Sequence, residues 1–196
     1  MIGDIKIYEV ELKARLKTGQ IGDIAKILKD VYKCQAKRCI YNDTYFDTIS
    51  KDFFKTEREL RLRKIITDQA EKVLLTYKDP PFDNLSKSKC EREVKVSSRE
   101  ETSAILGHLG YIEDISFEKH CINFQVKYRS FEILATLVSM SELEQDFIEV
   151  EVLTNNTDAI TQINEVLHEF LSRLNVAPEQ LTNEYYTDMV RHLRGQ

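Results

Sequence analysis

The sequence predicts an α+β fold in which an antiparallel β-sheet of about eight strands is covered by helices. Short segments in which charged and apolar residues alternate recur along the first three quarters of the chain. This period of two is typical of strands with one apolar face. Apolar residues at helical spacing occur near the start and in the last quarter instead. The chain has 196 residues, 42% of them hydrophobic, and a single domain over residues 1–196 is expected.

The first strand, residues 8–15, shows the alternation most clearly. Glu9, Glu11, Lys13 and Arg15 share one face, because successive side chains of a strand point to opposite sides. The other strands are expected at residues 39–47, 59–65, 72–78, 90–96, 118–126, 131–137 and 147–152.

Four helices are predicted between and after these strands. The helix after Ser98 carries a capping signal, because the serine hydroxyl can accept a hydrogen bond in the first turn and Glu101 follows at the capping-box position. An exposed loop is expected over residues 79–89, which are rich in proline, serine and lysine. The helices are expected at residues 20–33, from Ser98 to about 107–110, within 157–174 and at 184–193.

Composition excludes several classes of protein. The net charge of −5 is modest and the charges are interspersed, so we expect no nucleic-acid partner. No apolar run is long enough to cross a bilayer, and a cytoplasmic protein with no membrane partner is expected. Cys34, Cys39, Cys90 and Cys121 lack paired spacing, which favours reduced, packed thiols over a zinc site or disulfides.

The strands place many charges of both signs on one face of the sheet. If the sheet closes into a barrel, this face points inward, where unpaired charge is expensive and requires counter-charge, metal or ligand. Carboxylates suit Mg²⁺ or Mn²⁺, and lysine and arginine suit phosphate oxygens, so a metal-bound polyphosphate would satisfy both. The charged residues on this face are Glu9, Glu11, Lys13, Arg15, Glu59, Arg61, Arg63, Lys72, Lys78, Glu91, Glu93, Lys95, Lys119, Glu149 and Glu151.

Seven segments in order resemble the motifs of the CYTH superfamily, the triphosphate tunnel metalloenzymes. Residues 9–13 resemble its ExExK signature, and the closing strand at 147–151 resembles its E-x-E strand. The resemblance covers about residues 5–152, followed by a helical part at about 157–194. The other five matches are residues 43–47 (D-x-Y-F-D), 60–63 (R-x-R), 75–80 (T-x-K and turn), 91–93 (acidic strand) and 118–119 (lysine strand).

The resemblance implies an eight-stranded antiparallel β-tunnel that binds a triphosphate with divalent metal. It implies Lys13, Glu9 and Glu11 as catalytic residues. It implies phosphate binding by Lys13, Arg61, Arg63, Lys78 and Lys119, metal binding by Glu9, Glu11, Glu149 and Glu151, and support from Glu91 and Glu93. Asp43 and Tyr45 are expected in the scaffold and at the tunnel mouth. Arg15, Glu59, Lys72 and Lys95 match no motif position and are expected to be salt-bridged or solvated.

Two positions depart from the family pattern. Cys121 stands where an arginine usually follows the lysine strand, and a thiol cannot hold phosphate as a guanidinium does. Thr136 stands where an aspartate usually binds metal, and its hydroxyl is a weak Mg²⁺ ligand. Glu142, Glu144 or Asp146 could supply the missing carboxylate.

The resemblance favours a class IV adenylate cyclase-like enzyme that uses Mg²⁺ or Mn²⁺ to convert ATP to cyclic AMP and pyrophosphate. Tyr185-Tyr186 partly matches the tail of such proteins, where a Ser-Tyr pair occurs. An inorganic or thiamine triphosphatase is the first alternative. A catalytically weak or inactive module that binds nucleotide or polyphosphate is the second, because of Cys121 and Thr136. ATP or another triphosphate is therefore the expected partner, and a homodimer is a possible assembly.

Overall fold

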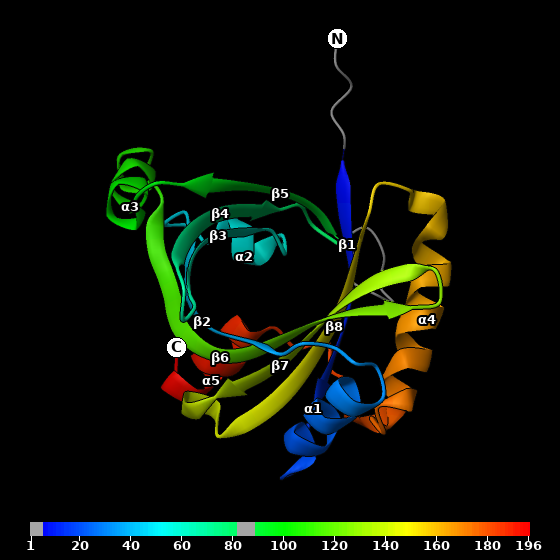
Figure 1. Ribbon diagram of the computed structural model, residues 1–196. Coiled ribbons are helices and arrows are strands. Elements are labelled where there is room, and N and C mark those ends of the chain that lie inside the picture. The colour runs from blue at the N-terminus through cyan, green and yellow to red at the C-terminus, as the bar shows by residue number, and fades with distance from the viewer. Residues whose placement is uncertain (1–5, 82–88) are drawn as a thin grey trace.

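The computed structural model describes residues 6–81 and 89–196 and shows a closed antiparallel barrel flanked by helices (Figure 1). The strands follow one another around the barrel in the order β1-β5-β4-β3-β2-β6-β7-β8. They are β1 Ile7–Arg15, β2 Lys37–Asp47, β3 Glu59–Ile66, β4 Glu71–Lys78, β5 Lys89–Val96, β6 Ile112–Tyr128, β7 Phe131–Met140 and β8 Gln145–Thr154. The predicted α+β fold with an eight-stranded barrel is confirmed. Most of the expected loop at 79–89 lies outside the described residues.

The described α-helices are α1 Gln20–Asp30, α2 Asp52–Lys55, α3 Arg99–His108, α4 Ile160–Arg173 and α5 Tyr186–Arg194. Short 3₁₀ turns occur at Ser141–Leu143, Thr157–Ala159 and Pro178–Gln180. The Ser98 hydroxyl accepts a hydrogen bond from the Glu101 amide at 3.1 Å, so the predicted cap of α3 is present. None of the described helices is long and apolar enough to cross a membrane.

The main apolar core lies between the outer face of the barrel and helices α1 and α4. Alternate residues of β1, β7 and β8 point outward into it while their neighbours point into the barrel. Phe170 and Leu167 of α4 and Leu28 of α1 are fully buried there. The same alternation that builds this core therefore directs the charged residues inward.

A second outer core lies beneath α2 and α3, where Phe53 and Leu106 pack against Phe46, Leu60 and Leu62 of β2 and β3. Helix α2 was not predicted. The Asp47 carboxylate accepts hydrogen bonds from the Phe53 and Phe54 amides, each at 2.9 Å, and so caps the start of α2 from outside the helix.

Strand β6 begins six residues before its predicted start. Between Tyr45 and Phe46 the β2–β6 register shifts, because Tyr45 faces Ile115 whereas Phe46 faces Glu113. Asp114 is therefore an extra residue in a β-bulge. The bulge separates Ile112 from Ile115 by three positions, which interrupts the alternation that marks the rest of the strand.

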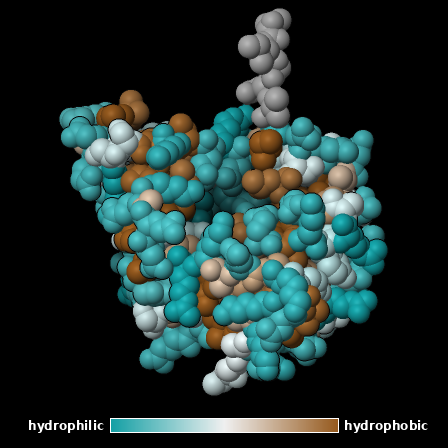
Figure 2. All heavy atoms as spheres, viewed as in Figure 1, coloured by the Kyte–Doolittle hydropathy of each residue, from teal (hydrophilic) through white to brown (hydrophobic). Residues whose placement is uncertain are grey.

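Helix α5 packs beside β6 and the Ser141–Leu143 turn. Tyr186, Met189 and Val190 of α5 join a third apolar cluster with Phe117 and Phe147, which point to the inner side of the barrel. In the space-filling view, hydrophilic side chains predominate and a hollow opens near the centre of the visible face (Figure 2).

Candidate functional site

A cavity of about 290 Å³ runs through the barrel, and side chains from each of its strands line the wall. We call it the tunnel. Every site residue expected from the sequence lines it, namely Glu9, Glu11, Lys13, Arg61, Arg63, Lys78, Glu91, Glu93, Lys119, Glu149 and Glu151. The alternation in the strands therefore brings residues from distant parts of the sequence to one internal surface.

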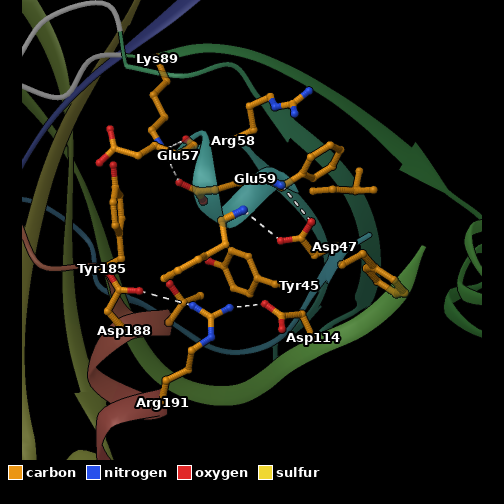
Figure 3. Close-up of a pocket in the computed structure, with 15 residues that line it drawn as sticks. Tyr45, Asp47, Glu57, Arg58, Glu59, Lys89, Asp114, Tyr185, Asp188 and Arg191 are labelled. Carbon is orange, nitrogen blue, oxygen red and sulfur yellow. Dashed lines mark hydrogen bonds and ion pairs between the residues drawn. The ribbon is translucent and has the colours of Figure 1, made fainter. Parts of the chain in front are cut away.

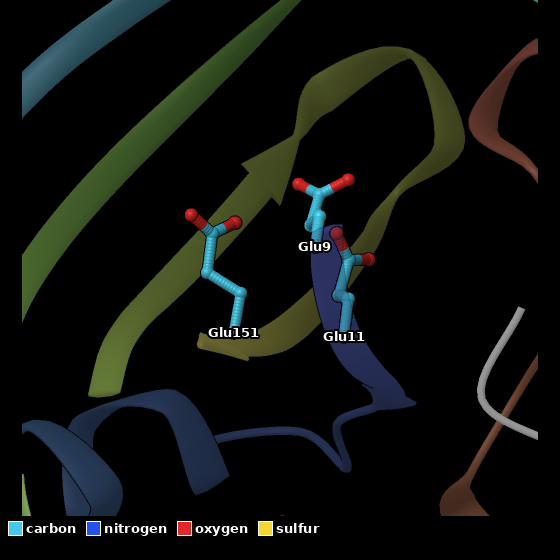
Figure 4. Close-up of side chains that lie close together, drawn as sticks. All are labelled: Glu9, Glu11 and Glu151. Atoms are coloured by element: carbon cyan, nitrogen blue, oxygen red, sulfur yellow. The ribbon is translucent and has the colours of Figure 1, made fainter. Parts of the chain in front are cut away.

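Three carboxylates gather on one wall of the tunnel, where β1 and β8 are neighbours (Figure 4). Glu9, Glu11 and Glu151 each offer an oxygen atom within 4.8 Å of the others. Glu11 and Glu151 are directly opposed across the two strands, an arrangement that destabilises a sheet when both residues are charged. We call these three residues the acidic cluster.

Burial is the main cause that raises the pKa of Glu11, to about 7, and the nearby charges of Glu149 and Glu9 raise it further. Burial also raises the pKa of Glu151 well above its ordinary value, again with help from Glu9 and Glu11. Crowded carboxylates that resist ionisation fit a divalent cation, because the cation supplies the missing positive charge. Glu9, Glu11 and Glu151 are therefore suitable ligands for Mg²⁺ or Mn²⁺.

Glu149, the fourth residue expected to bind metal, lies beside lysines. Its carboxylate is 3.6 Å from the Lys119 ammonium group, and it is opposed to Lys13 across β1 and β8. Burial opposes its ionisation, but the positive charges of Lys119 and Lys13 dominate and lower its pKa. Glu149 is thus held as a carboxylate between the acidic cluster and the basic part of the tunnel.

The basic residues form a connected surface opposite and beside these carboxylates. Lys78 forms ion pairs with Glu9 and, at 3.2 Å, with Glu91. Its pKa is raised well above the ordinary value, because these carboxylates outweigh the opposing effect of burial. Burial instead lowers the pKa of Lys13. The supporting residue Glu93 accepts a hydrogen bond from Thr76 at 2.9 Å.

Arg61 and Arg63 differ in their partners. Arg63 makes two hydrogen bonds to the buried Asp43 carboxylate, at 2.6 and 2.7 Å, and its guanidinium lies over the Tyr41 ring. Asp43 therefore acts as scaffold, as expected. The Arg61 Nε atom is buried and has no hydrogen-bond partner among the described residues. A buried donor without a partner is costly, and a phosphate oxygen in the tunnel would satisfy it.

Lys89 lines the tunnel although it matches no family motif. Tyr186 also lines it, although the partial tail match gave this residue no role in the site. Lys89 is 4% exposed and bonds to the Glu59 carboxylate at 2.6 Å and the Glu57 carbonyl at 2.8 Å. Lys89 lies two positions before Glu91 and so shares its face of the strand, which could have identified it. The sequence instead predicted a loop up to this residue. Glu59 is salt-bridged as expected, although it also lines the tunnel.

The other three charged residues that match no family motif, Arg15, Lys72 and Lys95, do not line the described tunnel. Arg15 pairs with Glu184 at 2.6 Å in an exposed position. Lys72 and Lys95 are exposed side chains. They are solvated or salt-bridged, in agreement with the expectation from sequence.

Thr136 lines the tunnel directly opposite Glu149. Cys121 is buried and opposed to Cys39 across β2 and β6, and it is absent from the described tunnel wall. The three carboxylates considered as substitutes for the missing aspartate do not line the described tunnel. Glu142 pairs with Arg194, Asp146 accepts a hydrogen bond from Ser139, and Glu144 is exposed.

A second cavity of about 210 Å³ adjoins the tunnel (Figure 3). We call it the side cavity. The two cavities share Tyr45, Glu59, Lys89, Tyr185 and Thr187 in their walls. The rest of the side cavity is lined by Phe46, Asp47, Phe53, Phe54, Glu57, Arg58, Leu60, Asp114, Asp188 and Arg191.

Comparison with known proteins agrees with this architecture. A candidate adenylate cyclase of Methanocaldococcus jannaschii is 27% identical over 186 residues, which cover 93% of this chain and 98% of that protein. The structure of the PH1819 protein from Pyrococcus horikoshii superposes with a TM-score of 0.79 and 25% identity, covering 94% of this chain and 98% of that one.

A second similar structure is that of a Hippeastrum protein described as a candidate adenylyl cyclase with a dominant triphosphatase activity. It shows the same fold, with a TM-score of 0.65 and 15% identity, and 95% of each chain is covered. The family model for the CYTH domain matches residues 8–186. This chain therefore belongs to the CYTH domain family.

Proposed function

We propose that this protein binds a nucleoside triphosphate together with Mg²⁺ or Mn²⁺ in the tunnel and acts as an adenylate cyclase of the class IV type. The products from ATP would be cyclic AMP and pyrophosphate. The combination of an acidic cluster and a basic surface in one cavity supports metal–triphosphate binding, because each set of charges matches one part of that ligand.

We favour a nucleotide over inorganic polyphosphate as the ligand, because the side cavity adjoins the tunnel and offers space for an organic group. The triphosphate would lie among the tunnel's basic residues, Lys13, Arg61, Arg63, Lys78 and Lys119. The organic group would enter the side cavity, where Tyr45, Phe54 and Tyr185 offer apolar and aromatic surface. Aromatic rings can pack against a planar organic group, and the charged and polar residues of the same wall can form hydrogen bonds that orient it.

Cyclisation requires the ribose 3′-oxygen to attack the α-phosphorus while the bond to the pyrophosphate leaving group breaks. Basic side chains along the tunnel would stabilise the charge that develops on the departing phosphates. Glu9, Glu11 and Glu151 would hold the metal, with Glu149 beside them. A divalent cation at this place would neutralise charge on phosphate oxygens and help to align the reacting groups.

Two alternatives share the same tunnel. In a triphosphatase, water attacks the γ-phosphorus. This reaction is the first alternative, because the Hippeastrum protein of the same fold is described as having a dominant triphosphatase activity. A binding module without turnover is supported by Thr136, because a hydroxyl replaces a carboxylate directly opposite Glu149.

Product analysis separates these three functions. The protein is incubated with ATP, GTP, thiamine triphosphate or tripolyphosphate, with Mg²⁺ or Mn²⁺, and every product is identified by chromatography. Cyclic AMP and pyrophosphate from ATP are the expected result, and Glu9→Gln should abolish both products. Orthophosphate and a diphosphate would identify a triphosphatase. Binding without any product would identify a binding module.

Phe54→Ala tests the role of the side cavity. Phe54 is 55% exposed and lines that cavity but not the tunnel. Its loss should weaken ATP binding about tenfold, as expected for loss of an aromatic contact, and leave tripolyphosphate binding unchanged. Ile49→Ala is the matched control, because Ile49 is 82% exposed and lines neither cavity. Equal losses for both ligands would show that the side cavity does not hold the organic group.

A further inference from the structure

Tyr186, the first residue of α5, extends into the tunnel from the C-terminal part of the chain. Its side chain is 7% exposed and packs against two aromatic rings of the barrel. The Phe147 ring is 5.1 Å away at 88°, and the Phe117 ring is 6.3 Å away at 57°. These contacts fix the position of the Tyr186 ring.

The helix that carries Tyr186 is itself anchored to the barrel. Arg191 pairs with Asp114, the extra residue of the β6 bulge. At the end of α5, Arg194 makes two hydrogen bonds to the Glu142 carboxylate, at 2.6 and 2.9 Å. The contacts of its ring and the anchoring of its helix therefore both fix Tyr186 in the tunnel.

Two ammonium groups lie against the Tyr186 ring. The Lys13 Nζ atom is 4.4 Å from the ring centroid, and the Lys119 Nζ atom is 4.5 Å from it. Both distances are within the range of a cation–π interaction. Lys13 belongs to β1 and Lys119 to β6, which are not neighbours in the barrel. The ring thus contributes to bringing two flexible lysines to one region of the tunnel.

The Tyr186 hydroxyl is a buried polar group that makes no hydrogen bond with the described residues. The Glu149 carboxylate lies next to it, although not in hydrogen-bonding geometry. A buried hydroxyl without a partner is unfavourable, and such groups are uncommon in folded proteins. A ligand oxygen in the tunnel would provide the missing acceptor.

We propose that Tyr186 is a further substrate-binding and positioning residue of the tunnel. Its hydroxyl donates a hydrogen bond to a phosphate oxygen, and its ring holds the ammonium groups of Lys13 and Lys119 toward the same phosphate chain. This inference rests on the proposed function, namely that the tunnel binds a triphosphate. It adds a neutral donor from the C-terminal helix to the lysines and arginines that the barrel strands supply.

Two substitutions separate the hydroxyl from the ring. Tyr186→Phe keeps the aromatic face and removes the donor, so tripolyphosphate binding with Mn²⁺ should weaken about tenfold in calorimetry. Tyr186→Leu also removes the aromatic face and should weaken binding at least a further threefold. In ATP turnover, Tyr186→Phe should raise KM while kcat changes less than about twofold, because the phosphate contact is present before and during reaction.

Tyr128→Phe is the matched control. The Tyr128 hydroxyl bonds to Glu169 at 2.8 Å, outside the tunnel wall, so this change removes a tyrosine hydrogen bond without touching the site. It should leave tripolyphosphate affinity unchanged. Near-ultraviolet circular dichroism checks that each variant keeps its packing.

The outcomes distinguish this inference from the proposed function. If the unaltered protein binds no triphosphate, the proposed function fails, and this inference fails with it. If the unaltered protein binds and Tyr186→Phe binds equally well, the hydroxyl contact is wrong. If Tyr186→Leu then matches Tyr186→Phe, the positioning of the lysines by the ring is wrong as well. Should Tyr186→Leu not fold, Tyr186→Phe still decides the hydroxyl contact, and Tyr186→Met, which also lacks an aromatic face, replaces Tyr186→Leu in the test of the ring.

Discussion

Replacing Glu11 by Gln should stabilise the metal-free protein and weaken its metal binding at the same time. Glu11 faces Glu151 across β1 and β8 and belongs to the acidic cluster with Glu9. Gln keeps the size of the side chain and removes its charge. The change therefore relieves repulsion in the empty cluster but removes one of three carboxylates from the place where the cation would bind.

The size of the stabilisation follows from the pKa of Glu11, which folding raises from 4.5 to about 7. Folding thus favours the protonated form, and the metal-free protein loses stability as the pH rises from about 4.5 through 7. At pH 8 this loss amounts to about 3 kcal/mol, which is the upper value of the gain from Gln. At pH 4.5 most of this gain should disappear, because Glu11 is then protonated in the folded protein.

Thermal unfolding at pH 8, with a chelator or with Mn²⁺, measures both effects. For a domain of this length, about 3 kcal/mol corresponds to a rise in Tm of about 6 to 12 °C with the chelator present. Addition of Mn²⁺ should raise the Tm of the unaltered protein and have little effect on Glu11→Gln. A lower Tm for the variant with chelator, together with an undiminished response to Mn²⁺, would refute the acidic cluster as a metal site.

Three further substitutions test other parts of the tunnel. Arg61→Ala should weaken tripolyphosphate binding by about 1.5 to 3 kcal/mol in calorimetry with little loss of stability, and unchanged affinity would contradict its role in phosphate binding. Arg63→Ala should weaken binding similarly but also destabilise the fold by about 3 to 5 kcal/mol, because Asp43 is left buried without its partner; urea unfolding measures this difference. Thr136→Asp should tighten Mn²⁺ binding because it adds a carboxylate opposite Glu149, and looser binding would show that the tunnel has no place for another negative charge.

The alternation of charged and apolar residues explains why the strands and most of the tunnel residues could be predicted from the sequence. Glu9, Glu11 and Lys13 share a face in any regular strand, and the apolar residues between them supply the buried face of the barrel. Strand assignment therefore also assigns most of the tunnel wall. The family resemblance added the closure of the sheet, which alternation alone does not determine.

The features that were missed depend on contacts between distant residues. Helix α2 is capped by Asp47, and the bulge at Asp114 hides the start of β6. The side cavity combines residues of β2, α2 and α5, and no periodic pattern connects these segments. The separation of Glu149 from the acidic cluster likewise depends on which charges oppose each other across strands.

The most direct test of the tunnel as a metal–triphosphate site is a crystal structure of the protein with Mn²⁺ and tripolyphosphate. Anomalous scattering would locate Mn²⁺ independently of the phosphate density. The account predicts Mn²⁺ bound by carboxylates of Glu9, Glu11 and Glu151, with the phosphate chain contacting Arg61 inside the barrel. Mn²⁺ and tripolyphosphate bound only on the outer surface would contradict it.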